Sequence, residues 1–208
     1  FDAAKEAARK LAVARGDEVV PIINRVAPAF EHVVLTQDWH PAGHVSFATS
    51  HVGTAPFQTM MLPYGEQVLW PDHCVQGTPG AALHADLRIP HARMVIRKGH
   101  HANVDSYSAF MEADRTTKTG LAGYLREQGV RRVVCVGLAT DYCVAWTALD
   151  ARAAGFEAVV VEDACRAIDL NGSLDRAWRE LAAAGVRRAT ADALRSGAGT
   201  HNPWLPES

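Results

Sequence analysis

Short apolar runs rich in β-branched residues recur along the chain, and each is followed by a polar or glycine-containing turn. Near-continuous apolar runs of this length are typical of strands that are buried on both faces of a sheet. The pattern therefore predicts strands at residues 32–38, 93–99, 132–139, 157–163 and 186–190.

Helix-like stretches separate these runs. The pattern predicts helices at residues 17–30, 119–128, 141–154 and 173–184. Gly129, Gly155 and Gly185 follow the last three stretches, where a residue in the left-handed conformation commonly ends a helix. Alternating strands and helices favour right-handed crossovers, so we expect a three-layer α/β/α fold around a mainly parallel sheet.

The segment from His40 to His91 keeps neither a strand period nor a helix period. It is rich in proline, glycine, histidine and aromatic residues, and eight of the ten histidines lie between His40 and His101. Long irregular segments in compact domains are usually functional, so we expect the chemistry to gather here. Without a repeat or linker, residues 1–208 are interpreted as a single domain.

Composition narrows the classes of function. The chain has 208 residues, a formal charge of -2 and interleaved charges, which argues against nucleic acid or membrane as a partner. No apolar run approaches the roughly 18 residues of a membrane span. The four cysteines lie far apart without a C-x-x-C pair, so we expect reduced thiols and a cytoplasmic location.

Cys143 lies where a buried strand runs through a turn into a helix. With Thr140 as the N-cap, Cys143 takes the third helical position, where backbone N–H groups and the helix dipole favour a thiolate and lower the cysteine pKa. The same amides could stabilise an oxyanion. The alternative is a buried structural cysteine, which is the interpretation that we give to Cys135 and Cys165.

Asp38 and His40 close the first predicted strand. Residues at i and i+2 of a strand point to the same face, so one carboxylate and one imidazole can reach a common metal ion. His73 and His44 are the candidates for a third ligand. A plain hydrogen bond between Asp38 and His40 is the alternative.

Lys98 ends the predicted strand at residues 93–99. Its ammonium would lie at the same sheet edge as Cys143 and stabilise an anionic partner or substrate. A solvated lysine at a strand end is the alternative.

Five segments, in this order and spacing, resemble the nicotinamidase/pyrazinamidase branch of the isochorismatase-like cysteine hydrolases. They read LAVARGDEVVPIIN, TQDWHPAGHVSF, WPDHCVQGTPGAALH, KGHHANVDSYSAF and VGLATDYCV. The similarity runs from about Leu11 to Ala189 and implies the isochorismatase-like hydrolase fold.

The resemblance implies roles for the candidate residues. Cys143 and Lys98 resemble members of the family's catalytic trio, and the backbone N–H groups of Ala139 and Cys143 would form the oxyanion hole, with a cis peptide between Leu138 and Ala139. The metal ligands would be Asp38, His40 and His73, binding one divalent ion, with Zn expected and Fe or Mn as alternatives, while His44 ranks fourth. Trp70 and Tyr107, with Tyr142 nearby, look like the residues that pack against the substrate ring.

The implied reaction converts nicotinamide to nicotinate and ammonia through a cysteine thioester, as in NAD salvage, with pyrazinamide as a second candidate substrate. The alternatives are a related small-amide or carbamoyl hydrolase and a catalytically inactive ligand-binding homologue. A homo-oligomer is also compatible with the sequence, although no segment identifies an interface.

The amino terminus departs from the family pattern. The family's base is an aspartate on a first strand of pattern Asp-x-Gln-x-Asp-Phe, whereas this chain opens at Phe1 and continues DAAKEAARK. We therefore expect the chain to lack the first strand, and the base to lie just before Phe1. Asp2 does not follow a strand and is not assigned this role.

Overall fold

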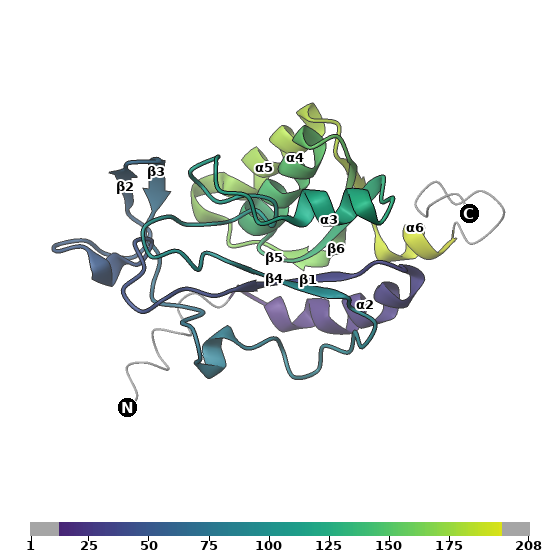
Figure 1. Ribbon diagram of the computed structural model, residues 1–208, viewed down its shortest axis with the longest axis horizontal. Coiled ribbons are helices and arrows are strands. Elements are labelled where there is room, and N and C mark those ends of the chain that lie inside the picture. The colour runs from purple at the N-terminus through teal and green to yellow at the C-terminus, as the bar shows by residue number, and fades with distance from the viewer. Residues whose placement is uncertain (1–12, 197–208) are drawn as a thin grey trace.

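A layer of parallel strands lies at the centre of the computed structural model, which describes residues 13–196 (Figure 1). Its strands are β1 (Val34–Asp38), β4 (Met94–Lys98), β5 (Arg132–Leu138), β6 (Glu157–Arg166) and β7 (Arg187–Ala189). β1 pairs with β4, and β6 pairs with both β5 and β7, all in parallel. These strands match the predicted ones, with shifts at their ends.

Helices cover both faces of the sheet (Figure 1). One layer holds α3 (Leu121–Glu127), α4 (Ala145–Ala153) and α5 (Ser173–Ala183), and the other holds α2 (Val19–Val26) with α6 (Ala191–Ser196) beside it. The expected three-layer α/β/α fold is confirmed.

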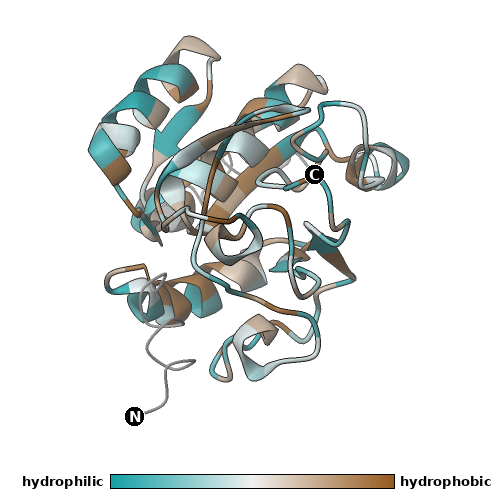
Figure 2. Ribbon diagram, turned by 90° about the vertical axis from the view of Figure 1, so that its left-hand side faces the viewer, coloured by the Kyte–Doolittle hydropathy of each residue, from teal (hydrophilic) through white to brown (hydrophobic). Residues whose placement is uncertain are grey.

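β6 shows why the strand sequences are almost continuously apolar. Val160 packs in the cluster that includes Ala148 of α4 and Leu181 of α5, whereas its neighbour Val161 packs against Ile23 of α2 on the other side. Both valines are fully buried. Successive strand residues point to opposite faces, so a sheet covered on both sides requires apolar residues at every position. Figure 2 shows this hydrophobic colouring along the central strands.

Glycine and proline residues mark the ends of the helices. Gly129, Gly155 and Gly185 have φ of 68°, 91° and 73° after α3, α4 and α5, as expected. The stretch predicted as one helix at 17–30 is instead three pieces, with 3-10 turns at Gly16–Glu18 and Ala27–Ala29 around α2. Pro28 lies in the second turn, and since proline cannot donate a backbone hydrogen bond, α2 ends before it.

The segment predicted to be irregular contains a small antiparallel hairpin. β2 (Thr59–Leu62) pairs with β3 (Gly65–Val68), and 3-10 turns lie at Ala48–Ser50 and Pro79–Ala81. The prediction missed the hairpin because each strand is only four residues long and the apolar Met61 is 74% exposed, which hides the alternation.

Within residues 13–196 the parallel strands form two groups, β1–β4 and β5–β6–β7, that are not hydrogen-bonded to each other. The expected lack of a first strand concerns the start of the chain and lies outside the described residues. None of the helices in the described part is long and apolar enough to cross a membrane.

Candidate active site

Cys143 lies in a single π-helical turn, Thr140–Val144, between β5 and α4. The peptide bond between Leu138 and Ala139 is cis, as the resemblance implied. The N–H groups of Tyr142 and Val144 both donate to the Ala139 carbonyl at 3.1 Å, so the turn folds back onto the strand end. The prediction of Thr140 as the N-cap was wrong, because Ala139 precedes the helical turn and Cys143 is its fourth residue.

Asp141 holds this turn in place. Its carboxylate accepts hydrogen bonds from the N–H groups of Ile168 at 3.0 Å and Asp169 at 2.8 Å. The residue is 6% exposed, so the two bonds satisfy a buried charge. Sequence reasoning missed this role, although Asp141 lies inside the segment that it singled out.

Lys98 is buried at the end of β4, at the sheet edge where it was expected. Its Nζ lies 3.2 Å from Cys143 Sγ, donates to the Ser106 carbonyl at 3.0 Å and forms an ion pair with Asp38. Only 3% of the residue is exposed, which excludes the solvated lysine.

The protonation of this pair differs from the prediction. Burial raises the pKa of the Cys143 thiol to about 11, and the lowering effect of the Lys98 ammonium is smaller. Burial alone would lower the pKa of Lys98, but the Asp38 carboxylate and Cys143 raise it overall. The predicted low pKa of Cys143 was therefore wrong, because desolvation of the thiolate outweighs the charge beside it. At neutral pH the pair is a thiol and an ammonium, so a base must take the thiol proton.

Asp38, His40 and His73 form a cluster beside Lys98 in which the ligand atoms lie within 4.8 Å of one another. His40 Nδ1 donates to the Gly99 carbonyl at 2.9 Å, and His73 Nδ1 donates to the Pro71 carbonyl at 2.8 Å. These bonds leave Nε2 of each ring available to a metal ion, in the manner of oriented histidine ligands.

The charge state of both rings also suits a metal. Burial, and then the neighbouring His73, lowers the pKa of His40 to about 4. Burial likewise lowers the pKa of His73. Both imidazoles are neutral at pH 7, the form that binds a cation. The residues therefore fit a divalent metal with two nitrogen ligands and one oxygen ligand.

His44 differs from His73 in the hydrogen bonds that its ring nitrogens make. The ligand atoms of His44, His40 and Asp105 also lie within 4.8 Å of one another. However, its Nδ1 bonds with the Ser46 hydroxyl at 2.7 Å and its Nε2 with the Val104 carbonyl at 3.1 Å, so both nitrogens are engaged. The rank of His44 as fourth candidate stays a prediction.

The three aromatic candidates meet in one group. The ring centroid of Trp70 lies 4.9 Å from that of Tyr142 and 6.3 Å from that of Tyr107, both edge to face. Trp70 Nε1 and Gln67 Nε2 donate to the Tyr107 hydroxyl at 2.9 and 3.0 Å. Gln67 also donates to the buried Asp105 at 2.8 Å. Gln67 lies in the hairpin that the sequence pattern did not predict, and Asp105 lies in one of the five family-like segments but had no predicted role.

Gly99 is a further residue whose role the sequence analysis did not predict. Its φ is +61°, and a Cβ built there would lie 2.4 Å from His40 Cε1, whereas its carbonyl accepts the hydrogen bond from His40. No side chain fits this position without moving the imidazole. Gly99 therefore sets the orientation of one candidate ligand.

Comparison with known proteins decides the family. Residues 4–193 match the model of the Isochorismatase domain. The chain belongs to the isochorismatase family. Among members of this family, the nicotinamidase of Acinetobacter baylyi is 60% identical over 86% of this chain and 83% of its own length.

Solved structures support the assignment to the isochorismatase family. A nicotinamidase and pyrazinamidase from Acinetobacter baumanii superposes with a TM-score of 0.87 at 60% identity, covering 88% of each chain. The pyrazinamidase of Pyrococcus horikoshii in complex with zinc has a TM-score of 0.69 at 35% identity, covering 86% of this chain and 89% of its own.

Proposed function

We propose that this member of the isochorismatase family is a nicotinamidase, which hydrolyses nicotinamide to nicotinate and ammonia in NAD salvage. The observation that carries the proposal is the 3.2 Å contact between Lys98 Nζ and Cys143 Sγ, with the Asp38, His40 and His73 cluster adjoining Lys98. The 60% identity to a nicotinamidase over most of the chain supports the substrate. The four cysteines are all free, which fits our assignment of the enzyme to the reducing cytoplasm.

Cys143 is the proposed nucleophile. Its sulfur attacks the carboxamide carbon, and the C–N bond then breaks to release ammonia and leave a thioester. Water attacks the thioester carbon, giving the carboxylic acid and returning the thiol. The backbone N–H groups of Ala139 and Cys143 are the proposed oxyanion hole for both tetrahedral intermediates.

Lys98 stabilises the negative charge that develops on the sulfur, because its ammonium already lies against Sγ. A carboxylate must accept the thiol proton and deliver it to the leaving ammonia. Asp38 pairs with Lys98 but also belongs to the metal cluster. In the family pattern, an aspartate on a strand of pattern Asp-x-Gln-x-Asp-Phe carries out this proton transfer, and we do not assign the role to Asp38.

Asp38, His40 and His73 are the proposed ligands of the divalent ion. We propose zinc, with iron and manganese as alternatives, because the ligand set suits it and the related pyrazinamidase of Pyrococcus horikoshii is in complex with zinc. The bound ion would orient the pyridine ring through its nitrogen. Trp70, Tyr107 and Tyr142 would pack against this flat ring and make pyrazinamide a second substrate.

Ammonia release from nicotinamide tests this function. With zinc bound, we expect the chain to release ammonia. A second chain carries an added strand of the pattern Asp-x-Gln-x-Asp-Phe whose Phe is Phe1. Its rate of ammonia release should be roughly 10²- to 10⁴-fold higher, since this is the typical contribution of a general base. The matched control carries Asn in place of the first Asp. Zinc binding without ammonia release from either chain would instead support a ligand-binding homologue or a carbamoyl hydrolase.

His73→Ala should remove most of the zinc from this cluster. Loss of a group that merely orients a ligand costs roughly 10- to 100-fold in metal affinity, so loss of a ligand should cost more than roughly 100-fold. Zinc affinity measured by competition with a chelator checks this. His44→Ala is the matched comparison, and a greater loss of affinity in His44→Ala would contradict the assignment of His73.

A further inference from the structure

A second group of metal-ligating side chains lies outside the active site. His100, His101 and Glu112 place their ligand atoms within 4.8 Å of one another. They line a cavity of about 310 Å³ whose other walls include Ile96, Thr117 and Thr119. The cavity lining contains none of Cys143, Lys98 or the residues of the Asp38, His40 and His73 cluster.

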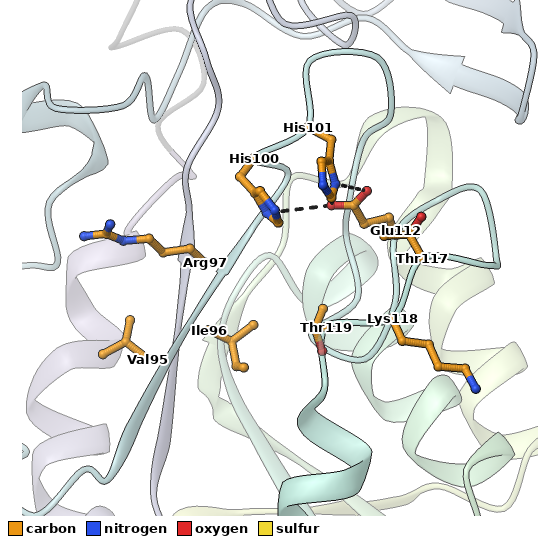
Figure 3. A pocket seen from close by; sticks show the side chains of 9 residues that line it. All are labelled: Val95, Ile96, Arg97, His100, His101, Glu112, Thr117, Lys118 and Thr119. Carbon is orange, nitrogen blue, oxygen red and sulfur yellow. Dashed lines mark hydrogen bonds and ion pairs between the residues drawn. The ribbon is translucent and has the colours of Figure 1, made fainter.

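Both imidazoles face the same carboxylate. His101 Nδ1 lies 2.8 Å from each oxygen of Glu112, and His100 Nδ1 lies 3.9 Å from Oε1. Figure 3 shows the two rings side by side and pointing toward Glu112. Their centroids are 4.0 Å apart. One ion can therefore reach Nδ1 of both rings and a carboxylate oxygen with only small side-chain rotations.

The backbone of Glu112 is hydrogen-bonded and its side chain is buried. Its backbone N–H donates to the Thr117 carbonyl at 2.8 Å, next to the bridge between Met111 and Lys118. Only 2% of the residue is exposed, whereas the side chains of His100 and His101 are 49% and 50% exposed. Burying a carboxylate costs free energy unless a cation or several hydrogen-bond donors pair with it. Here one imidazole N–H is shared between the two oxygens, which offsets only a small part of that cost.

The nearby basic side chains do not fill this role. Figure 3 shows the Lys118 ammonium and the Arg97 guanidinium pointing away from Glu112. Arg115, three residues along the loop, instead pairs with Asp150 at 2.6 Å. In the described part of the chain, the ion pairs of Glu112 are those with the two histidines. Among the basic side chains of residues 13–196, the carboxylate is therefore paired with the two imidazoles and not with a lysine or arginine.

We propose that His100, His101 and Glu112 form a second divalent metal site, separate from the active site. Two imidazole nitrogens and one carboxylate oxygen suit zinc and its late first-row neighbours, with water completing the coordination. Metal binding at Nδ1 of His101 moves the proton that now bonds with Glu112 to Nε2 of the same ring or to solvent. The site does not depend on the proposed function, since it shares no ligand with the active-site cluster.

Zinc stoichiometry in the 208-residue chain tests the proposal. After dialysis against Zn²⁺ the parent should hold two ions per chain, and the double variant His100→Gln, His101→Gln should hold one. The glutamine amide can still donate to Glu112, so the fold should survive, and circular dichroism checks this. His84→Gln changes an exposed histidine elsewhere and should keep two ions.

His73→Ala separates the two sites, because it should lose the active-site ion and keep the second one. Glu112→Gln, which preserves size, should also bind one ion and provides a second test if the double variant fails to fold. Two ions in either His100→Gln, His101→Gln or Glu112→Gln would overturn the proposal. A single ion in the parent that is lost in His73→Ala would overturn it as well.

Discussion

Replacing Cys143 by alanine is expected to reduce ammonia release from nicotinamide by more than roughly 10⁴-fold, the scale seen when a hydrolase loses its nucleophile. Without the sulfur no thioester can form, and the Lys98 ammonium that lies 3.2 Å from it has no reacting group to stabilise. Turnover measured with active-site zinc saturated checks this. The variant should keep its fold and its zinc, since the side chain supplies none of the proposed ligands.

Cys165→Ala is the matched control for Cys143→Ala. Cys165 is 3% exposed and packs in the core cluster of α4 and α5, away from Lys98. Its loss should lower stability by about 1 kcal/mol, through a small cavity, and leave kcat near the parent value. The assignment of the nucleophile fails if Cys143→Ala keeps a kcat within tenfold of the parent.

Lys98→Met should lower kcat by about 10²- to 10³-fold, the typical cost of removing one preorganised charge or donor from a reacting centre. Methionine keeps most of the apolar stem but removes the ammonium from Cys143, Ser106 and Asp38 at once. Because the Asp38 side chain remains 24% exposed, we expect a loss of stability of about 2 kcal/mol, below the roughly 3–5 kcal/mol of fully buried pairs.

Arg97→Met provides the control for Lys98→Met on the same strand. The Arg97 guanidinium lies over the Trp39 ring at 3.9 Å, and its loss should leave kcat unchanged. Rates are compared below the unfolding temperature of every variant, with urea titration measuring stability separately. Equal kcat values for Lys98→Met and Arg97→Met would remove Lys98 from the mechanism.

The parts of the fold that depend on burial could be predicted from the sequence. β6 is apolar from Ala158 to Val161, where both faces of the strand are covered, so its strand was recognised from composition alone. The strand ends carrying Lys98 and Asp38 were likewise found, since polar residues that end an apolar strand stand out. Carboxyl ends of parallel strands meet at one edge, which is why separate motifs could be placed together.

Other parts depend on contacts that no local pattern contains. The hairpin β2–β3 supplies Gln67, which bonds with Tyr107 and Asp105, and its short strands gave no readable alternation. The pKa of Cys143 depends on how deeply the sulfur is buried, and the position of the residue in a predicted helix does not give this burial. The role of Asp141 depends on the N–H groups of Ile168 and Asp169, which lie in the loop just after β6.

Gly99 gives the two histidine clusters a shared peptide unit. Its carbonyl accepts the hydrogen bond from His40, and the nitrogen on the other side of the same bond belongs to His100. A rotation of that peptide by an ion at the outer cluster would move the acceptor that aligns the inner ligand. Thermodynamic linkage then requires that each ion changes the affinity of the chain for the other ion by the same factor. The peptide between Gly99 and His100 would then couple the binding of the proposed active-site ion to that of the proposed second ion.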